Sequence, residues 1–104
     1  MGSARTKRDV LNTLRRNSGR LQALGVKRLG LFGSFVRGEQ KPVSDVDLLV
    51  EFEPGKKTFD NFMELSFFLE ELLQRKVEVV TVEALSPHLG PHILREVEYV
   101  SLAA

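Results

Sequence analysis

Two aspartates, Asp45 and Asp47, stand two positions apart around the start of an apolar run, residues 46–50. Side chains at positions i and i+2 of a β-strand point to the same face of the sheet. The spacing therefore predicts two neighbouring carboxylates, the kind of oxygen ligands that hard divalent cations prefer. The pair alone is a weak signal, because aspartates also cap turns and loops.

A glycine–serine pair, Gly33-Ser34, follows an earlier strand-like run at residues 28–32. A small turn at a strand end offers backbone N–H groups to which a phosphate can come close. Arg37 in the same turn is a candidate for binding a triphosphate, with an ion pair to Glu39 as the alternative. The sequence contains neither Gly-x-x-x-x-Gly-Lys-Ser/Thr nor Gly-x-Gly-x-x-Gly, which excludes a P-loop or a dinucleotide-binding motif.

A third acid, Glu78, is the only acidic residue inside the third predicted strand, residues 76–82. Two-metal nucleotidyl transfer needs carboxylates that hold cations against the developing charge, commonly three of them. If this strand lies beside the second one, Glu78 could hold a metal and accept a proton from an attacking hydroxyl. The alternative is a solvated residue on an edge strand. His88 and His92 are poor metal candidates, because Pro91 separates them and no acidic motif accompanies them.

The elements that position these residues follow from the spacing of apolar side chains. The sequence predicts helices at 6–24, 60–74 and 91–97, strands at 26–32, 46–52 and 76–82, and a turn with a short helix at 33–38. The second strand is nearly continuous in apolar residues, which predicts burial on both faces. This order predicts an α/β (α+β) fold with a small mixed sheet flanked by helices.

The composition is that of an ordinary globular domain: 104 residues, 42% hydrophobic and 28% charged. We expect a single domain over residues 1–104. The absence of cysteine excludes disulfides and thiolate chemistry. No apolar run approaches the roughly 20 residues of a membrane span, and the N-terminus is polar, so we expect a cytoplasmic protein without a membrane partner.

Charge is unevenly distributed although the net charge is only +1. Residues 1–41 carry ten Lys or Arg and two Asp or Glu, whereas residues 42–104 carry five and twelve. One interpretation is a solvated basic helix over an acidic remainder. The other is a basic side that faces phosphate or an acidic partner and an acidic side that collects metal.

Taken together, these motifs resemble the signature of the DNA polymerase β-type nucleotidyltransferase superfamily. The size and the Gly-Ser-Phe-x-Arg-Gly-Glu form are similar to the minimal nucleotidyltransferases, the MNT family. The resemblance runs from the basic N-terminal helix to the segment 93–100. It is carried by Gly33-Ser34, Arg37-Gly38 and Ser44-Asp45-Val46-Asp47-Leu48.

The resemblance implies a Gly33-Ser34 turn that holds a nucleoside triphosphate and a site with Mg²⁺, two ions being expected. It implies Asp45 and Asp47 as ligands and a third acid at Glu78. The family more often has Asp at that third position, and the extra methylene of Glu moves the carboxylate by roughly 1.5 Å, one bond length. Misplacement of about 1 Å can cost ~100-fold in rate.

The function implied is transfer of a nucleoside monophosphate, AMP from ATP, to a partner protein. The resemblance further implies pairing with a HEPN-domain toxin, of which this chain would be the antitoxin; some members modify a tyrosine of the toxin. One alternative is an antitoxin that neutralises its toxin only by binding. Another is a small-molecule transferase of the aminoglycoside type, which the lack of an acceptor-binding domain disfavours. No direct nucleic-acid partner is expected.

Overall fold

The computed structural model describes residues 4–102, so the ends of the predicted domain, 1–3 and 103–104, lie outside the described residues. One four-stranded sheet has the strand order β3-β2-β1-β4. Strand β1 pairs antiparallel with β2 and β4, and β2 pairs parallel with β3. The predicted mixed sheet is thereby confirmed. The strands are β1 (Val26–Phe32), β2 (Val46–Phe52), β3 (Val77–Thr81) and β4 (Glu98–Val100).

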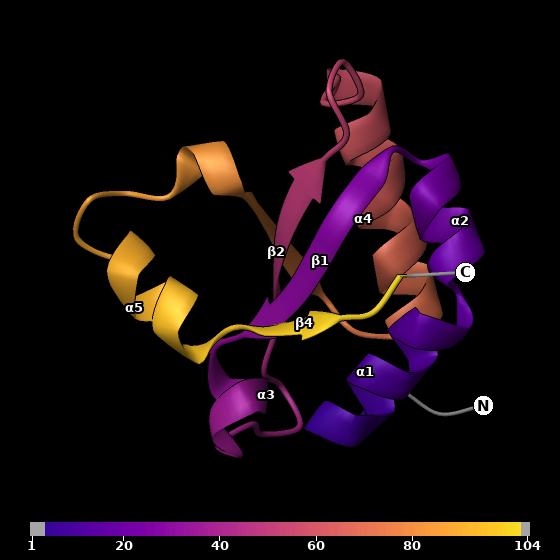
Figure 1. Cartoon of the computed structure of the whole chain (residues 1–104). Coiled ribbons are helices and arrows are strands. Elements are labelled where there is room, and N and C mark those ends of the chain that lie inside the picture. Colours follow the sequence, from indigo (N-terminus) through magenta and orange to yellow (C-terminus); the bar gives the residue numbers. More distant parts are fainter. Residues whose placement is uncertain (1–3, 103–104) are drawn as a thin grey trace.

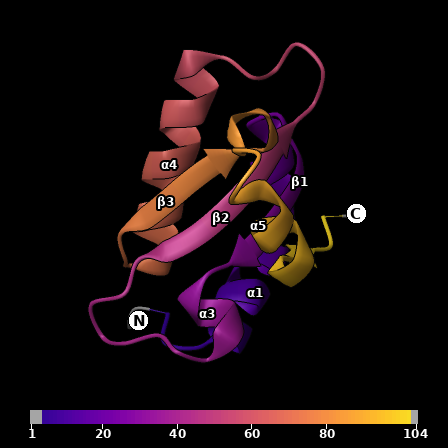
Figure 2. The same ribbon diagram turned by 90° about the vertical axis from the view of Figure 1, so that its left-hand side faces the viewer.

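Helices cover the sheet unequally (Figures 1 and 2). Helix α4 (Phe59–Leu73) forms the crossover that a parallel β2–β3 pair requires, and it packs on one face together with α1 (Lys7–Arg16) and α2 (Ser18–Ala23). The opposite face carries α5 (Gly90–Glu96), which Figure 2 shows in front of the strands. The short helix α3 (Ser34–Arg37) follows β1, and a 3-10 turn, η1 (Val82–Ala84), follows β3.

The hydrophobic core lies between the sheet and helices α1, α2 and α4. Alternate residues of β2 enter it, and the leucines of α4 meet them at helical spacing. The other residues of β2 face the α5 side, where Leu49 is also buried while Asp47 is half-buried. Fully buried members of the core include Val10, Leu14, Leu21, Leu31, Val46, Leu48, Val50, Leu65 and Leu69.

The predicted helix 6–24 is in fact two helices, with the break at Asn17. The backbone of Asn17 leaves the helical region (φ −112°, ψ 22°), and its side-chain Nδ2 donates a hydrogen bond to the Thr13 carbonyl at 2.8 Å. Asparagine offers the backbone such local alternatives to helical hydrogen bonding. Gly19 adds a residue of poor helix propensity directly after the break. Within residues 4–102 no helix is both long and apolar enough to span a membrane.

Candidate active site

Strand register brings the second and third predicted acids together. In the parallel β2–β3 pair, Asp47 stands opposite Glu78, and in the antiparallel β1–β2 pair Asp47 stands opposite Phe32, the last residue of β1. Asp47 is thus next to both the third acid and the turn that begins at Gly33. Asp45 lies two positions earlier, just outside β2, and is exposed, as is Glu78.

The turn at Gly33 is shaped by a backbone conformation that suits glycine. Gly33 has φ 80° and ψ −153°, a region that is sparsely populated by residues with a Cβ atom. A Cβ atom at this position would overlap Oδ2 of Asp47 and lie 3.0 Å from its Cγ. The Asp47 carboxylate therefore rests directly against the turn, and Ser34, half-buried, opens α3 immediately after it.

Burial and like charge act together on Asp47. Partial burial raises the pKa of this carboxyl from 3.8 to about 6, with further contributions from the negative charges of Glu78 and Asp45. Proximity to Glu78 acts in the same direction, because a protonated Asp47 could donate a hydrogen bond to that carboxylate, and the charge of Arg37 opposes the shift. These causes show three carboxylates close enough to repel one another, an arrangement that a bound cation would relieve.

The donor set of Asp45, Asp47 and Glu78 suits a hard cation, since all its ligand atoms are carboxylate oxygens. In the side-chain positions of residues 4–102, however, no three His, Cys, Asp or Glu are gathered closely enough to hold one ion. Two of the three acids are exposed and free to change rotamer. The carboxylate oxygens suit Mg²⁺ chemically, and the three side chains would have to move closer together to bind one ion.

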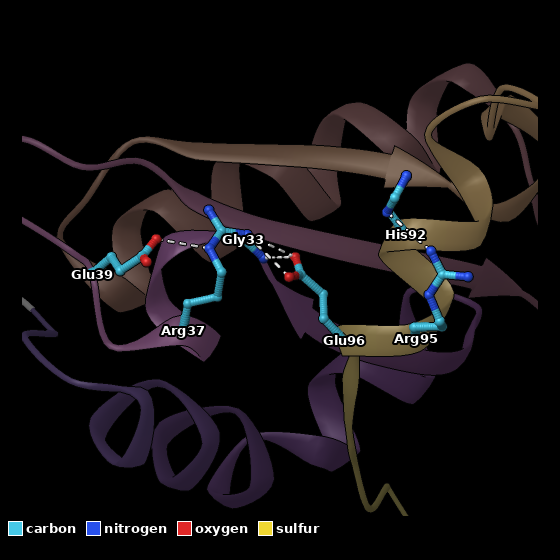
Figure 3. Close-up of polar contacts among 6 residues, drawn as sticks. All are labelled: Gly33, Arg37, Glu39, His92, Arg95 and Glu96. Carbon is cyan, nitrogen blue, oxygen red and sulfur yellow. Dashed lines mark hydrogen bonds and ion pairs between the residues drawn. The ribbon is translucent and has the colours of Figure 1, made fainter.

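A seventh site residue, Glu96 at the end of α5, was not predicted (Figure 3). Its Oε2 accepts a hydrogen bond from the Gly33 backbone N–H at 2.7 Å, and Arg37 Nη1 donates to both of its oxygens, at 3.0 and 3.2 Å. Arg37 Nε also donates to Glu39 at 2.8 Å, so the ion pair considered for Arg37 is present. These bonds to Glu39 and Glu96 raise the pKa of Arg37.

The two histidines contribute no metal site among the described residues. His92 Nδ1 lies 3.0 Å from Arg95 Nη2, and both side chains are exposed on α5, apart from Arg37 (Figure 3). One groove, of about 990 Å³, is lined mainly by residues of α1 and α4, and Asp45, Asp47 and Glu78 are not among its lining residues. The acidic cluster of Asp45, Asp47 and Glu78 is open to solvent at Asp45 and Glu78, whose side chains are exposed.

Comparison with known proteins adds to this geometry. The family model described as "Nucleotidyltransferase domain" matches residues 8–100. This chain belongs to the nucleotidyltransferase family. As a nucleotidyltransferase it is an enzyme by family membership, and the resemblance inferred from the Gly-Ser and Asp-x-Asp motifs is confirmed. Among its relatives is the protein adenylyltransferase MntA of Thermococcus cleftensis, 44% identical over 79 residues that cover 76% of this chain and 79% of the relative.

Solved structures agree with this placement of the nucleotidyltransferase. One that is provisionally described as a minimal nucleotidyltransferase superposes with a TM-score of 0.72 at 37% identity, covering 93% of this chain and 98% of the other. A toxin–antitoxin crystal structure with AMP-PNP reaches a TM-score of 0.63, covering 85% of this chain and 73% of the other. At 22% identity the latter shows a shared fold.

Proposed function

We propose that this nucleotidyltransferase transfers AMP from ATP to a hydroxyl group of a partner protein, and that the partner is a HEPN-domain toxin for which the chain is the antitoxin. The observation that carries the proposal is the register that sets Asp47 opposite Glu78 and against Gly33. This register joins an acidic cluster to a candidate phosphate turn. The name of the Thermococcus relative, a protein adenylyltransferase, supports a protein acceptor.

In the proposed reaction, the acceptor oxygen forms a bond to the α-phosphorus of ATP while the bond to the pyrophosphate leaving group breaks. The hydroxyl proton passes to the Glu78 carboxylate, which acts as the base. The donors of the Gly33-Ser34 turn and Arg37 bind the phosphates and orient them for in-line attack. Bound Mg²⁺, held by Asp45, Asp47 and Glu78, would neutralise negative charge on the phosphates.

The choice of acceptor rests on the openness of the acidic cluster. Asp45 and Glu78 are exposed, and neither residue lines the groove between α1 and α4 or the one beside Pro42 and Arg75. A small-molecule substrate is usually enclosed in a concave pocket, whereas a folded partner can supply the missing walls itself. A solved structure described as a toxin–antitoxin with AMP-PNP shares this fold, which supports a protein partner. A location in the cytoplasm and a single domain remain predictions.

The test separates binding from transfer. The full chain is co-purified with a HEPN-domain protein and incubated with Mg²⁺ and labelled ATP. We expect Glu78→Gln to be stabilised by Mg·ATP as wild type is, by about 2.7 kcal/mol at 100 times the dissociation constant, because nucleotide binding depends mainly on the Gly33-Ser34 turn, Asp45 and Asp47. Transfer should fall by about 100- to 10,000-fold. Glu83→Gln, an exposed acid that pairs with Lys57, is the matched control and should transfer normally.

Normal transfer by Glu78→Gln would refute the assignment of the base. Absence of transfer by the unmodified chain, with the toxin still neutralised, would favour the antitoxin that acts by binding alone. Loss of the Mg·ATP effect in Asp45→Asn and Asp47→Asn, together with its retention in Glu83→Gln, would support the proposed cation ligands.

A further inference from the structure

The Gly33 turn already holds an anion, and this anion belongs to the protein. The Glu96 carboxylate accepts from the Gly33 N–H at 2.7 Å and from Arg37 Nη1 at 3.0 and 3.2 Å. These two donors are the ones that the proposed function assigns to phosphate. Carboxylate and phosphate oxygens accept the same charge-assisted hydrogen bonds, so the two anions have the same requirements at this turn (Figure 3).

Both anions cannot occupy these donors at the same time. The Gly33 amide has a single proton, and Glu96 already accepts it. Arg37 is bound by two carboxylates, because Glu39 takes Nε while Glu96 takes Nη1. One guanidinium charge facing two carboxylates leaves this group with net negative charge, and the nearby Asp45, Asp47 and Glu78 add to it. As arranged, the turn repels a triphosphate rather than attracting one.

We propose that Glu96 is an internal competitor for the phosphate-binding donors of this turn, and that its displacement sets the affinity for the nucleotide. The inference rests on the proposed function, since it takes Gly33 and Arg37 to be phosphate donors. Glu96 can leave by rotation of its own side chain, while the residue after it stays in place. Val97 is held over Gly30, where a Cβ atom would overlap its Cγ2.

The helix that carries Glu96 is lightly anchored, which makes release inexpensive. Of the seven residues of α5, only Gly90 is fully buried. Leu94 is 53% exposed, and Leu89, which caps the helix, is 63% exposed. An element with few buried apolar contacts opens at low free energy. The ion pair with Arg37 is itself partly open to solvent, with the two side chains 48% and 26% exposed, so water can replace it.

The experiment compares Glu96→Gln with Glu98→Gln by calorimetric titration of the full chain with Mg·ATP. Glu98→Gln is the matched control, because it also removes one negative charge, two residues away on β4. Glu98 forms an ion pair with Lys7 and does not bind the Gly33 turn. We expect Glu96→Gln to bind Mg·ATP on the order of tenfold more tightly, which corresponds to about 1.4 kcal/mol. Glu98→Gln should change the affinity by less than about twofold, the effect of general charge at the surface.

A second titration uses magnesium tripolyphosphate, which has the phosphate chain without the nucleoside, and follows the Gly33 amide by ¹⁵N NMR. At saturating tripolyphosphate, the Gly33 amide resonance should have the same position in the unmodified chain and in Glu96→Gln. In both proteins the Glu96 carboxylate would then be absent from the Gly33 N–H. Unchanged or weaker Mg·ATP binding by Glu96→Gln would overturn the inference and indicate that Glu96 positions Arg37 instead.

The outcomes also separate this inference from the proposed function. Tighter tripolyphosphate binding by Glu96→Gln, without AMP transfer by any variant, would uphold the competition and refute the transferase. AMP transfer by the unmodified chain, with no gain in Mg·ATP affinity from Glu96→Gln, would support the transferase and refute the competition by Glu96. If neither Mg·ATP nor tripolyphosphate moves the Gly33 resonance in either protein, both proposals fall.

Discussion

At the scale of single residues, the candidate site is a balance of charges around Asp47 and Gly33. Three carboxylates crowd one side of the turn, and Arg37 is held between two more on the other side. Such clusters of perturbed groups are frequent at functional sites. In the absence of a ligand the crowded carboxylates oppose folding, because like charges repel, and the pH dependence of stability should reveal that repulsion.

The pH dependence of stability should report the state of Asp47. Its pKa in the folded chain, about 6, is above the usual 3.8. Protonation therefore favours the folded state, and this stabilisation is complete below pH about 4 and is lost as the pH rises through 6. With EDTA present, wild type should lose about 1 kcal/mol relative to Asp47→Asn between pH 4 and 7, a value reduced for solvent screening. Melting temperatures of both proteins that run parallel over this range would contradict the assignment.

Gly33→Ala should damage the site more than the same substitution at another glycine with positive φ. The methyl group would meet the Asp47 carboxylate in addition to an unfavourable backbone conformation, so we expect a loss of about 1–3 kcal/mol and loss of the Mg·ATP effect on melting. Gly38→Ala is the control, since Gly38 also has positive φ, 72°, but nothing lies within 4 Å of its Cβ position. Equal nucleotide responses in the two variants would show that the contact with Asp47 is unimportant.

At the scale of elements, local patterns predicted most of the fold. The bounds of β1 and β2 are as predicted, and those of α4 and α5 differ by one residue at each end. Strand β4 was missed, because three residues are too few for alternation to be visible. Glu96 was missed for a different reason. Its partners Gly33 and Arg37 are about 60 residues away, and no local pattern encodes a contact of that range. The side-by-side placement of Glu78 and Asp47 was conditional on strand order, which the sequence left open.

The start of α1 offers a test of how much local capping contributes to the free energy of unfolding. Thr6 Oγ1 accepts from the Asp9 N–H at 3.1 Å, and the Asp9 carboxylate accepts from the Thr6 N–H at 3.2 Å, a reciprocal capping box. Thr6→Ala should cost about 1 kcal/mol, lowering the melting temperature by roughly 4–8 °C for a domain of this size. Thr6→Ser keeps the hydroxyl and should melt close to wild type. A wild-type melting curve for Thr6→Ala would show that tertiary packing alone fixes this helix end.

At the scale of the whole molecule, Arg75 joins three distant segments. Its guanidinium donates to the Ser44 carbonyl at 2.7 Å, to the Pro42 carbonyl at 3.2 Å, and to the Ala4 carbonyl near the N-terminus. It also lies 5.0 Å from the centre of the Phe35 ring. A single side chain between α4 and β3 thus holds the loop that leads into the acidic cluster.

Arg75→Met should loosen this loop while preserving much of the side chain's bulk. We expect faster amide hydrogen exchange at residues 43–45 and a loss of about 1–3 kcal/mol, since hydrogen bonds to a charged group contribute more than neutral ones. Arg75→Lys keeps the charge without the planar fork and should give an intermediate result. Lys76→Met, a change at the exposed neighbouring residue, is the control. Exchange at 43–45 that is equal in all four proteins would exclude Arg75 as the tether.

The parallel β2–β3 pair also restricts how this chain can change in length. Val77 and Val79 pack against the core while Glu78, between them, stands opposite Asp47. Inserting or deleting one residue in the turn between α4 and β3 would exchange the two faces of β3. The Glu78 carboxylate would then point into the hydrophobic core, and a valine would take its place opposite Asp47. A chain with such a change would unfold rather than persist as a folded but inactive protein, so we expect the α4–β3 connection to tolerate substitutions far better than changes of length.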